Sequence, residues 1–213
     1  MIDRWVLKLK ASDREVNLES RHEPIAGYAG VPLRMTRDHL DNIPVFEPQE
    51  GYAIRWYAPG DAAHWLRIHE ESEGYGDLKP DLFADQYGSD EDVLSRRVAF
   101  ICKADGVPVS TNTAWMNDWN GKQWGRIHWV ATTRNEQGKG HSKSLMTSVC
   151  VRMQELGHDC AYLTTNALRV RAIALYAAFG FTAYWESEKE QVAWEKLIER
   201  MADLGKQVEV FRG

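Results

Sequence analysis

The stretch 134-RNEQGKGHSKSLM-146 places two glycines and three basic side chains just before a run with helical spacing. Lysines are unfavourable at the start of a helix, since the helix dipole makes that end partially positive. A bound polyanion would reverse this preference, because glycines let the backbone approach it and the unpaired N–H groups of a helix start donate to it. We therefore expect an anion at residues 138–142, complemented by Arg134, Lys139 and Lys143.

Two common phosphate-binding patterns do not fit this stretch. A P-loop has a glycine directly before its Lys-Ser/Thr pair, whereas Ser142 precedes Lys143 and Ser144 here. A dinucleotide-binding fingerprint requires a third glycine where Lys143 stands. Both patterns are therefore excluded.

Two separate motifs resemble the signatures of the GNAT superfamily of acyl-CoA-dependent N-acyltransferases. Residues 137-QGKGHS-142 match the Q/R-x-x-G-x-G/A signature, with Ser142 as the small residue in the last place. The stretch 171-RAIALYAAFGF-181 matches the second signature at Ala172, Leu175, Tyr176, Gly180 and Phe181. The two motifs occur in the expected order, and the resemblance covers about residues 52–186.

The order of hydrophobic patterns indicates an α/β (α+β) fold. Two alternating runs joined at Asp105-Gly106 indicate a β-hairpin. After the glycines, the chain runs helix, strand, helix, strand, an order typical of an α/β layer with a partly parallel sheet. The resemblance implies a GNAT-type mixed central sheet flanked by helices over residues 51–213. We expect residues 1–50 to be an N-terminal extension packed on this core and not a separate domain.

The resemblance also implies acetyl-CoA as a cosubstrate. Its pyrophosphate would meet Gln137, Gly138, Lys139, Gly140, His141 and Ser142, and its pantetheine arm would pair along Val130, Ala131 and Thr132. The chain departs from the second signature at Arg169, where the family usually has an asparagine. Asn166 is a candidate for the missing amide and Arg169 for a contact to the nucleotide phosphate, with a plain surface role as the alternative for each.

The reaction implied is attack by a primary amine on the thioester of acetyl-CoA. Tyr176 occupies the family position of the group that stabilises the departing thiolate, although an aromatic residue on a helix can also simply belong to the core. His128 is the candidate general base, on the same strand face as Val130 by alternation, with an inert strand histidine as the alternative. Weaker candidates for the base are Glu136 and His141, which lie beside the expected phosphates, and Asp118 and Glu186 at strand ends.

The sequence indicates least about the acceptor, the molecule whose amine receives the acetyl group. The segment 69-HEESEGYGDLKPD-81 is acidic, which suits a cationic amine, although acidic loops are often only solvated. The leading hypothesis is therefore an N-acetyltransferase acting on a small-molecule amine. The alternatives are a non-catalytic acyl-CoA-binding module and an enzyme that acetylates peptides or proteins.

The composition of the chain bears on its partners, its location and its metal content. A net charge of −5 gives no general attraction to nucleic acid or to anionic membranes. The sequence contains neither a signal-peptide pattern nor an apolar run of membrane-spanning length. Its three cysteines have no CxxC spacing, so they predict neither a metal site nor a disulfide framework. We expect a cytoplasmic protein, monomeric or homodimeric, without a metal.

Overall fold

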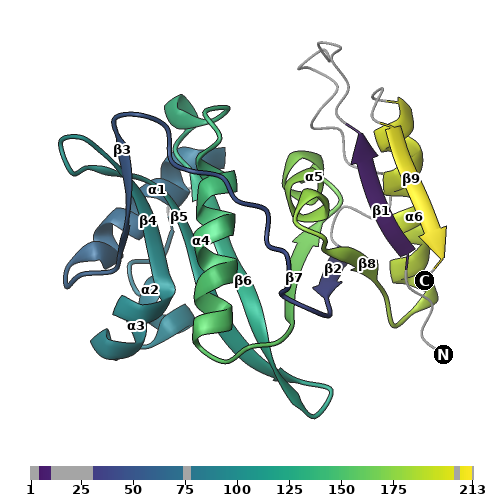
Figure 1. Ribbon diagram of the computed structural model, residues 1–213, viewed down its shortest axis with the longest axis horizontal. Helices are drawn as coiled ribbons and strands as arrows, with labels where there is room; N and C mark the ends of the chain where they lie inside the picture. The colour runs from purple at the N-terminus through teal and green to yellow at the C-terminus, as the bar shows by residue number, and fades with distance from the viewer. Residues whose placement is uncertain (1–4, 11–30, 74–77, 204–206, 213) are drawn as a thin grey trace. The chain divides into compact units, whose positions relative to one another are not determined.

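The computed structural model describes residues 5–10, 31–73, 78–203 and 207–212 (Figure 1). These residues form two compact units. The contiguous unit is the single stretch His39–Ala161. The discontinuous unit combines the described residues up to Asp38 with those from Tyr162 onward.

The contiguous unit is built on four antiparallel strands in the order β3-β4-β5-β6. These strands are β3 (Tyr52–Trp56), β4 (Val98–Lys103), β5 (Pro108–Trp119) and β6 (Lys122–Thr132). Its helices are α1 (Asp61–Glu73), α2 (Leu82–Tyr87), α3 (Glu91–Arg97), the 3-10 turn η2 (Arg134–Glu136) and α4 (His141–Glu155). The predicted hairpin at Asp105-Gly106 joins β4 to β5.

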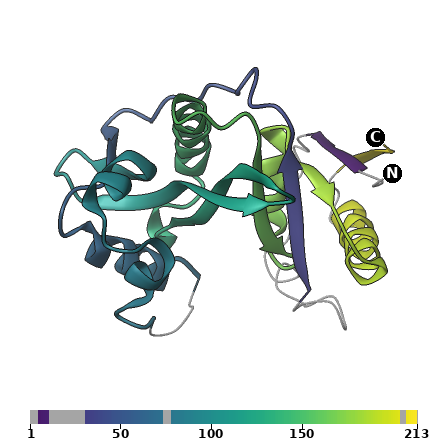
Figure 2. The same ribbon diagram turned by 90° about the horizontal axis from the view of Figure 1, so that it is seen from below.

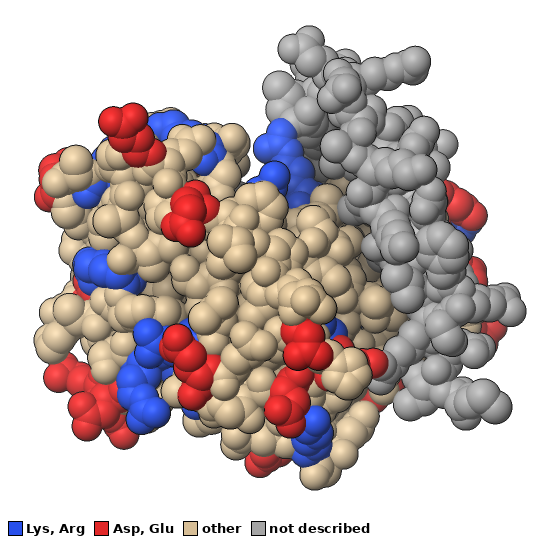
Figure 3. All heavy atoms as spheres, viewed as in Figure 1, with Lys and Arg blue, Asp and Glu red and all other residues tan. Residues whose placement is uncertain are grey.

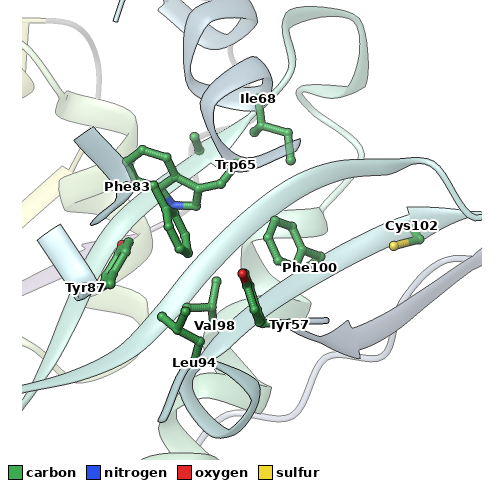
Figure 4. Close-up of a cluster of buried hydrophobic side chains, with 10 residues drawn as sticks. Tyr57, Trp65, Ile68, Phe83, Tyr87, Leu94, Val98, Phe100 and Cys102 are labelled. Carbon is green, nitrogen blue, oxygen red and sulfur yellow. The ribbon is translucent and has the colours of Figure 1, made fainter. Parts of the chain in front are cut away.

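Helices α1 and α4 cover opposite faces of this sheet (Figure 2, in which α4 is green and α1 blue). Alternate residues of β4, namely Val98, Phe100 and Cys102, belong to the core cluster that contains Trp65 of α1 (Figure 4). On the α4 side, the Asn112 amide of β5 lies 3.4 Å from the Met146 sulfur. Because successive side chains of a strand point to opposite faces, each strand contributes residues to the packing on both sides of the sheet.

Trp65 is the centre of the core between α1, α2 and the sheet, and it is fully buried. Its ring lies 5.5 Å from that of Phe83, 5.7 Å from that of Tyr87 and 5.1 Å from that of Trp129, all in edge-to-face arrangements. Such pairs add to the hydrophobic contribution of burial. They fix α1 and α2 against β6, the strand that leads into the glycine stretch.

Residues 39–49 follow an irregular, extended path along α4, antiparallel to the helix. Gln154 Nε2 donates to the Leu40 carbonyl at 2.8 Å, Thr147 Oγ1 to the Pro44 carbonyl at 2.8 Å, and Ser144 Oγ to the Glu47 carbonyl at 2.9 Å. This part of the N-terminal region therefore packs on a core helix. The division into an extension over 1–50 and a domain over 51–213 stays a prediction.

The discontinuous unit contains strands in the order β7-β2-β8-β1-β9. Their bounds are β1 (Trp5–Lys10), β2 (Pro32–Arg37), β7 (Ala161–Asn166), β8 (Thr182–Tyr184) and β9 (Gln207–Arg212). Helices α5 (Val170–Ala178) and α6 (Glu188–Asp203) belong to the same unit. Strand β2 pairs antiparallel with β8, and β1 pairs antiparallel with both β8 and β9. The predicted α/β class is confirmed.

Gly125 of β6 lies in close contact with the chain at Cys160 and with the side chain of Met153. Its N–H donates to the Cys160 carbonyl at 3.0 Å. A Cβ atom at this position would lie 3.2 Å from that carbonyl oxygen and 2.9 Å from the sulfur of Met153, which is fully buried. A side chain at this position would therefore force Met153 and the Cys160 carbonyl to shift.

Gly125→Ala is expected to lower the free energy of unfolding by about 1–3 kcal/mol, because overpacking a filled core forces neighbouring atoms to move. Urea unfolding followed by circular dichroism measures the change. A variant as stable as the wild type would show that Met153 and the Cys160 carbonyl move aside without cost.

Candidate functional site

The glycine stretch forms a tight turn that leads into α4. Gly138 and Gly140 have φ values of 83° and 79°, in the left-handed region that favours glycine. Gly140 is the N-cap residue of α4, which begins at His141. A Cβ atom on either glycine would meet nothing within 4 Å. The start of the helix therefore opens onto free space, as a backbone site for an anion requires.

The Gln137 side chain forms hydrogen bonds that connect this turn to two other segments of the contiguous unit. Its Nε2 donates to the Thr132 carbonyl at the end of β6 at 3.1 Å and to the Ser72 carbonyl of α1 at 3.0 Å. The Thr132 hydroxyl lies 2.7 Å from that of Ser110 and 3.3 Å from that of Ser142. The Gln137 amide thus ties the exposed turn to the end of β6 and to α1.

Glu136 lies directly before the turn and is buried, with 7% of its surface exposed. Its Oε2 accepts hydrogen bonds from Tyr52 at 2.7 Å and from Lys139 at 2.8 Å, and lies 3.4 Å from His141 Nε2. Lys103 Nζ is 3.4 Å from Oε1. Burial raises the pKa of this carboxyl, but the hydrogen bonds from Lys139, Tyr52, His141 and Lys103 outweigh it and lower the pKa to about 2.

The lowered pKa of Glu136 predicts a pH dependence of stability. Because the folded pKa is about 2 and the ordinary value is 4.5, the contribution of this carboxylate is present above pH 4.5 and is lost as the pH falls to 2. The free energy of unfolding of the wild type should therefore fall more steeply between pH 5 and pH 2 than that of Glu136→Gln. Urea unfolding at a series of pH values measures both slopes, and parallel curves would contradict the assignment.

The Lys139 side chain contacts the side chains around Glu136, whereas the sequence suggested that it would contact the anion directly. Its ammonium lies 2.8 Å from the Glu136 carboxylate and 3.1 Å from the Tyr52 hydroxyl, and both contacts raise its pKa. Arg134 and Lys143 are exposed on either side of the turn. Lys143 Nζ lies 5.2 Å from the centre of the Phe46 ring. The basic side chains of the turn therefore differ in their freedom to meet an anion.

Strand β6 contains a bulge before the turn, at Trp129. The pairing with β5 shifts between Thr111, opposite Ala131, and Thr113, opposite His128. Trp129 has a φ of 53°, which is uncommon for a bulky residue. The rings of His128 and Trp129 both lie on the α1–α2 side of the sheet, beside Tyr87 and Trp65 respectively. The predicted alternation that placed His128 with Val130 is therefore wrong, because a bulge adds one residue to the strand.

The hydrogen bonds of His128 fix its tautomer. Gln86 Oε1 accepts from Trp129 Nε1 at 2.9 Å, and an indole N–H can only donate, so the facing atom of Gln86 is its oxygen. His128 Nε2, 3.1 Å from the same oxygen, therefore donates its proton to it. The lone pair of the neutral ring lies on Nδ1.

Burial, followed by the charges of Arg126 and His69, lowers the pKa of His128 to about 3. The ring is therefore neutral at pH 7, as a base must be. Removing a proton from an alkylammonium with a pKa of ~10.4 would nevertheless be uphill by roughly 10 kcal/mol. This geometry suits a hydrogen-bonding role better than that of a strong general base.

Tyr176 lies on α5 in the discontinuous unit, with 7% of its surface exposed. Its ring centre is 6.4 Å from that of Phe181. The α5 helix ends at Ala178, and the guanidinium of buried Arg37, from β2, donates to the Phe179 carbonyl just beyond it. A cation at a helix C-terminus is favourable for the helix dipole. Residues of β2 thus support the segment that carries Tyr176.

The family model for the acetyltransferase (GNAT) family matches residues 61–181, more than half of the chain. The chain belongs to the GNAT acetyltransferase family. Members of this family are acyltransferases. A comparison with curated protein sequences returned no significant match.

Solved structures confirm the GNAT fold. A GCN5-related N-acetyltransferase from Sphaerobacter thermophilus is 19% identical, with a TM-score of 0.51 over 84% of this chain and 48% of its own. A Drosophila protein is 14% identical, with a TM-score of 0.54 over 72% and 50%. A Trypanosoma brucei acetyltransferase is 16% identical, with a TM-score of 0.50 over 64% and 96%. This chain spans about half the length of the first two, and at these identities the likeness shows the fold alone.

Arg169, the departure of this GNAT protein from the second signature, and Asn166, the candidate for the missing amide, both take part in the turn before α5. Asn166 Oδ1 accepts from the Leu168 N–H at 3.0 Å and so shapes the turn before α5. Arg169 is the N-cap residue of that helix, and its N–H donates to the Asn166 carbonyl at 3.1 Å. Their predicted contacts to the coenzyme stay predictions.

The structure also locates the remaining candidates of the GNAT protein, Glu186, Asp118 and part of the acidic segment 69–81. Glu186 accepts from Arg34 at 2.9 Å and from the Tyr184 hydroxyl at 3.0 Å, while Asp118 is exposed on β5. Of the acidic segment 69–81, residues 74–77 lie outside the described residues. On the face seen in Figure 3, acidic and basic side chains are interspersed over the contiguous unit.

Two further properties of the described residues concern metals and membranes. Among them, no group of three or more His, Cys, Asp or Glu side chains is arranged to hold a metal ion. None of the described helices has both the length and the apolar character that crossing a membrane requires.

Proposed function

We propose that the protein is an N-acetyltransferase that transfers the acetyl group of acetyl-CoA to the primary amine of a small molecule. The observation that carries the proposal is the pair of left-handed glycines, Gly138 and Gly140, which opens the start of α4 to free space within the stretch matched by the family model. Backbone N–H groups from Gly138 to Ser142 would bind the pyrophosphate of the coenzyme.

The bulge in β6 supports the placement of the pantetheine arm. A bulge leaves one residue outside the regular ladder, so backbone groups near Trp129 and Val130 are released from the pairing with β5. The arm would pair along Val130, Ala131 and Thr132, with its thioester near the bulge. Tyr176 would stabilise the thiolate that departs when the amine attacks.

The amine must lose a proton at some point in the reaction. For an alkylamine with a pKa of ~10.4, reaching the neutral form at pH 7 is uphill by roughly 4.6 kcal/mol. His128, with its low pKa, would orient the amine through Nδ1 and leave most of this proton transfer to water. The acidic side chains at the end of α1, Glu70 and Glu71, would favour a cationic acceptor.

The test separates binding from turnover. Calorimetry measures the affinity for CoA and acetyl-CoA, and the release of free thiol from acetyl-CoA is followed with a panel of small amines and of peptides with free N-termini. We expect tight binding of both nucleotides and thiol release that depends on a small amine. Release with peptides alone would favour the peptide acetyltransferase, and tight binding without any release would favour a non-catalytic acyl-CoA-binding module. The cytoplasmic location, the monomeric or homodimeric state and the absence of nucleic-acid or membrane partners stay predictions.

A further inference from the structure

A buried carboxylate stands beside the expected site of a polyanion, where its charge is unfavourable for the ligand. Glu136 ends η2, and the turn that begins two residues later is the proposed pyrophosphate site. We propose that Glu136 is a positioning residue that holds the coenzyme-binding turn in its binding shape. This inference rests on the proposed function.

One oxygen of Glu136 connects three segments of the chain. Oε2 accepts from Tyr52 of β3, from Lys139 between the two glycines, and faces His141 at the start of α4. The second oxygen faces Lys103 of β4. The contacts to Lys139 and His141 fall on both sides of Gly140. The carboxylate therefore fixes the part of the turn where the backbone has the most freedom.

Ring contacts also hold together the side chains that surround Glu136. The Tyr52 ring lies 4.4 Å from that of His141, and the Lys139 ammonium lies 5.7 Å from the Tyr52 ring centre. His141 is buried, with 2% of its surface exposed. Because glycine loses more conformational freedom on ordering than any other residue, a turn with two glycines benefits from such an external hold. A turn held before the ligand arrives binds it more tightly, since less ordering occurs on binding.

Electrostatics and positioning predict opposite effects of one substitution. Glu136→Gln removes a negative charge near Lys103 and Lys139, so the net charge around the turn rises by one. If charge alone mattered, the variant would bind the polyanionic CoA more tightly. If the carboxylate positions the turn, the variant binds CoA more weakly, because an amide cannot accept from Tyr52, Lys139 and His141 together.

The experiment compares CoA binding by calorimetry in the wild type, in Glu136→Gln and in the control Glu155→Gln. Glu155 is the last residue of α4, at the opposite end of that helix from the turn, and is also paired with a cation, Arg152, at 3.0 Å, but its side chain is more than half exposed. We expect Glu136→Gln to raise the Kd for CoA at least about tenfold and Glu155→Gln to change it less than about twofold. The KM for acetyl-CoA should rise in parallel, whereas kcat at saturation should stay within about threefold. A general loss of stability would not produce this split between KM and kcat.

Equal or tighter CoA binding by folded Glu136→Gln overturns the positioning role. If that variant does not fold, Tyr52→Phe decides, since it removes one hydrogen bond to the carboxylate and keeps all charges. A Kd for CoA raised about two- to fivefold supports the proposal, and an unchanged Kd overturns it. A wild type that binds no CoA refutes the proposed function itself, which distinguishes the two failures.

Discussion

Gly140→Val is expected to abolish measurable binding of acetyl-CoA, with a Kd raised at least about a hundredfold. The φ of 79° at this position is strongly unfavourable for a β-branched residue. In the free protein a Cβ atom here meets nothing within 4 Å, so the valine side chain would enter the space where the pyrophosphate is expected. The variant therefore both strains the turn and blocks the N–H groups at the start of α4. Calorimetry with acetyl-CoA measures the loss.

Gly121→Val is the matched control for backbone strain. Gly121 has a φ of 71°, also has open space over its Cβ position, and lies in the β5–β6 hairpin, at the end of β6 opposite the turn. It should lose a similar amount of stability and keep its affinity for acetyl-CoA. A folded Gly140→Val protein with unchanged affinity would show that the coenzyme does not bind at this turn.

Tyr176→Phe is expected to lower kcat by a factor on the order of ten to a thousand, with little change in the affinity for acetyl-CoA. A tyrosine with a pKa of ~10 protonates a thiolate with a pKa of ~8.5 only uphill, by roughly 2 kcal/mol, so its main effect is a hydrogen bond to the developing charge. In the proposed reaction that bond would form in the transition state and not in the ground state. Rapid-mixing measurements of a single turnover isolate the chemical step.

Tyr162→Phe provides the comparison for Tyr176→Phe. Tyr162 is a tyrosine of β7 in the same unit and is buried to a similar extent, with 8% of its surface exposed. Loss of its hydroxyl should leave the single-turnover rate within about twofold of the wild type. Wild-type chemistry in Tyr176→Phe would refute the role of the Tyr176 hydroxyl.

The parts of the fold that the sequence predicted depend on local signals. The Asp105-Gly106 turn, the apolar spacing of α4 and the two glycines each act within a few residues, so they can be read from a short stretch. The glycines at 138 and 140 also located the turn, because a left-handed backbone there excludes most other residues.

The parts that the sequence did not predict depend on distant partners. The bulge at Trp129 is set by the register between β5 and β6, and the letters HWVA carry no signal for an extra residue. The low pKa of His128 results from burial in the contiguous unit, where Gln86 and Tyr87 of α2 contact the ring. The sequence offered Glu136 only as a weaker candidate for the base, and its role in the cluster could not be read from it, since its partners Tyr52 and Lys103 lie on strands remote in the sequence. One signal pointed toward it: Lys139, placed at a helix start, needed a nearby anion.

The two units differ in when their strands become available as the chain is synthesised. All strands of the contiguous unit lie within residues 39–161, so this unit can fold while the ribosome is still adding the second signature. Strand β2, at residues 32–37, leaves the ribosome early but pairs with β8, at residues 182–184. Its other neighbour in the sheet, β7, spans residues 161–166, so β2 has to wait unpaired until at least that part of the chain has been made, and closing that long loop is a slow step in folding. The contact from Arg37 of β2 to the Phe179 carbonyl, which supports the end of the Tyr176 helix, can therefore form only after the chain has been made past residue 179.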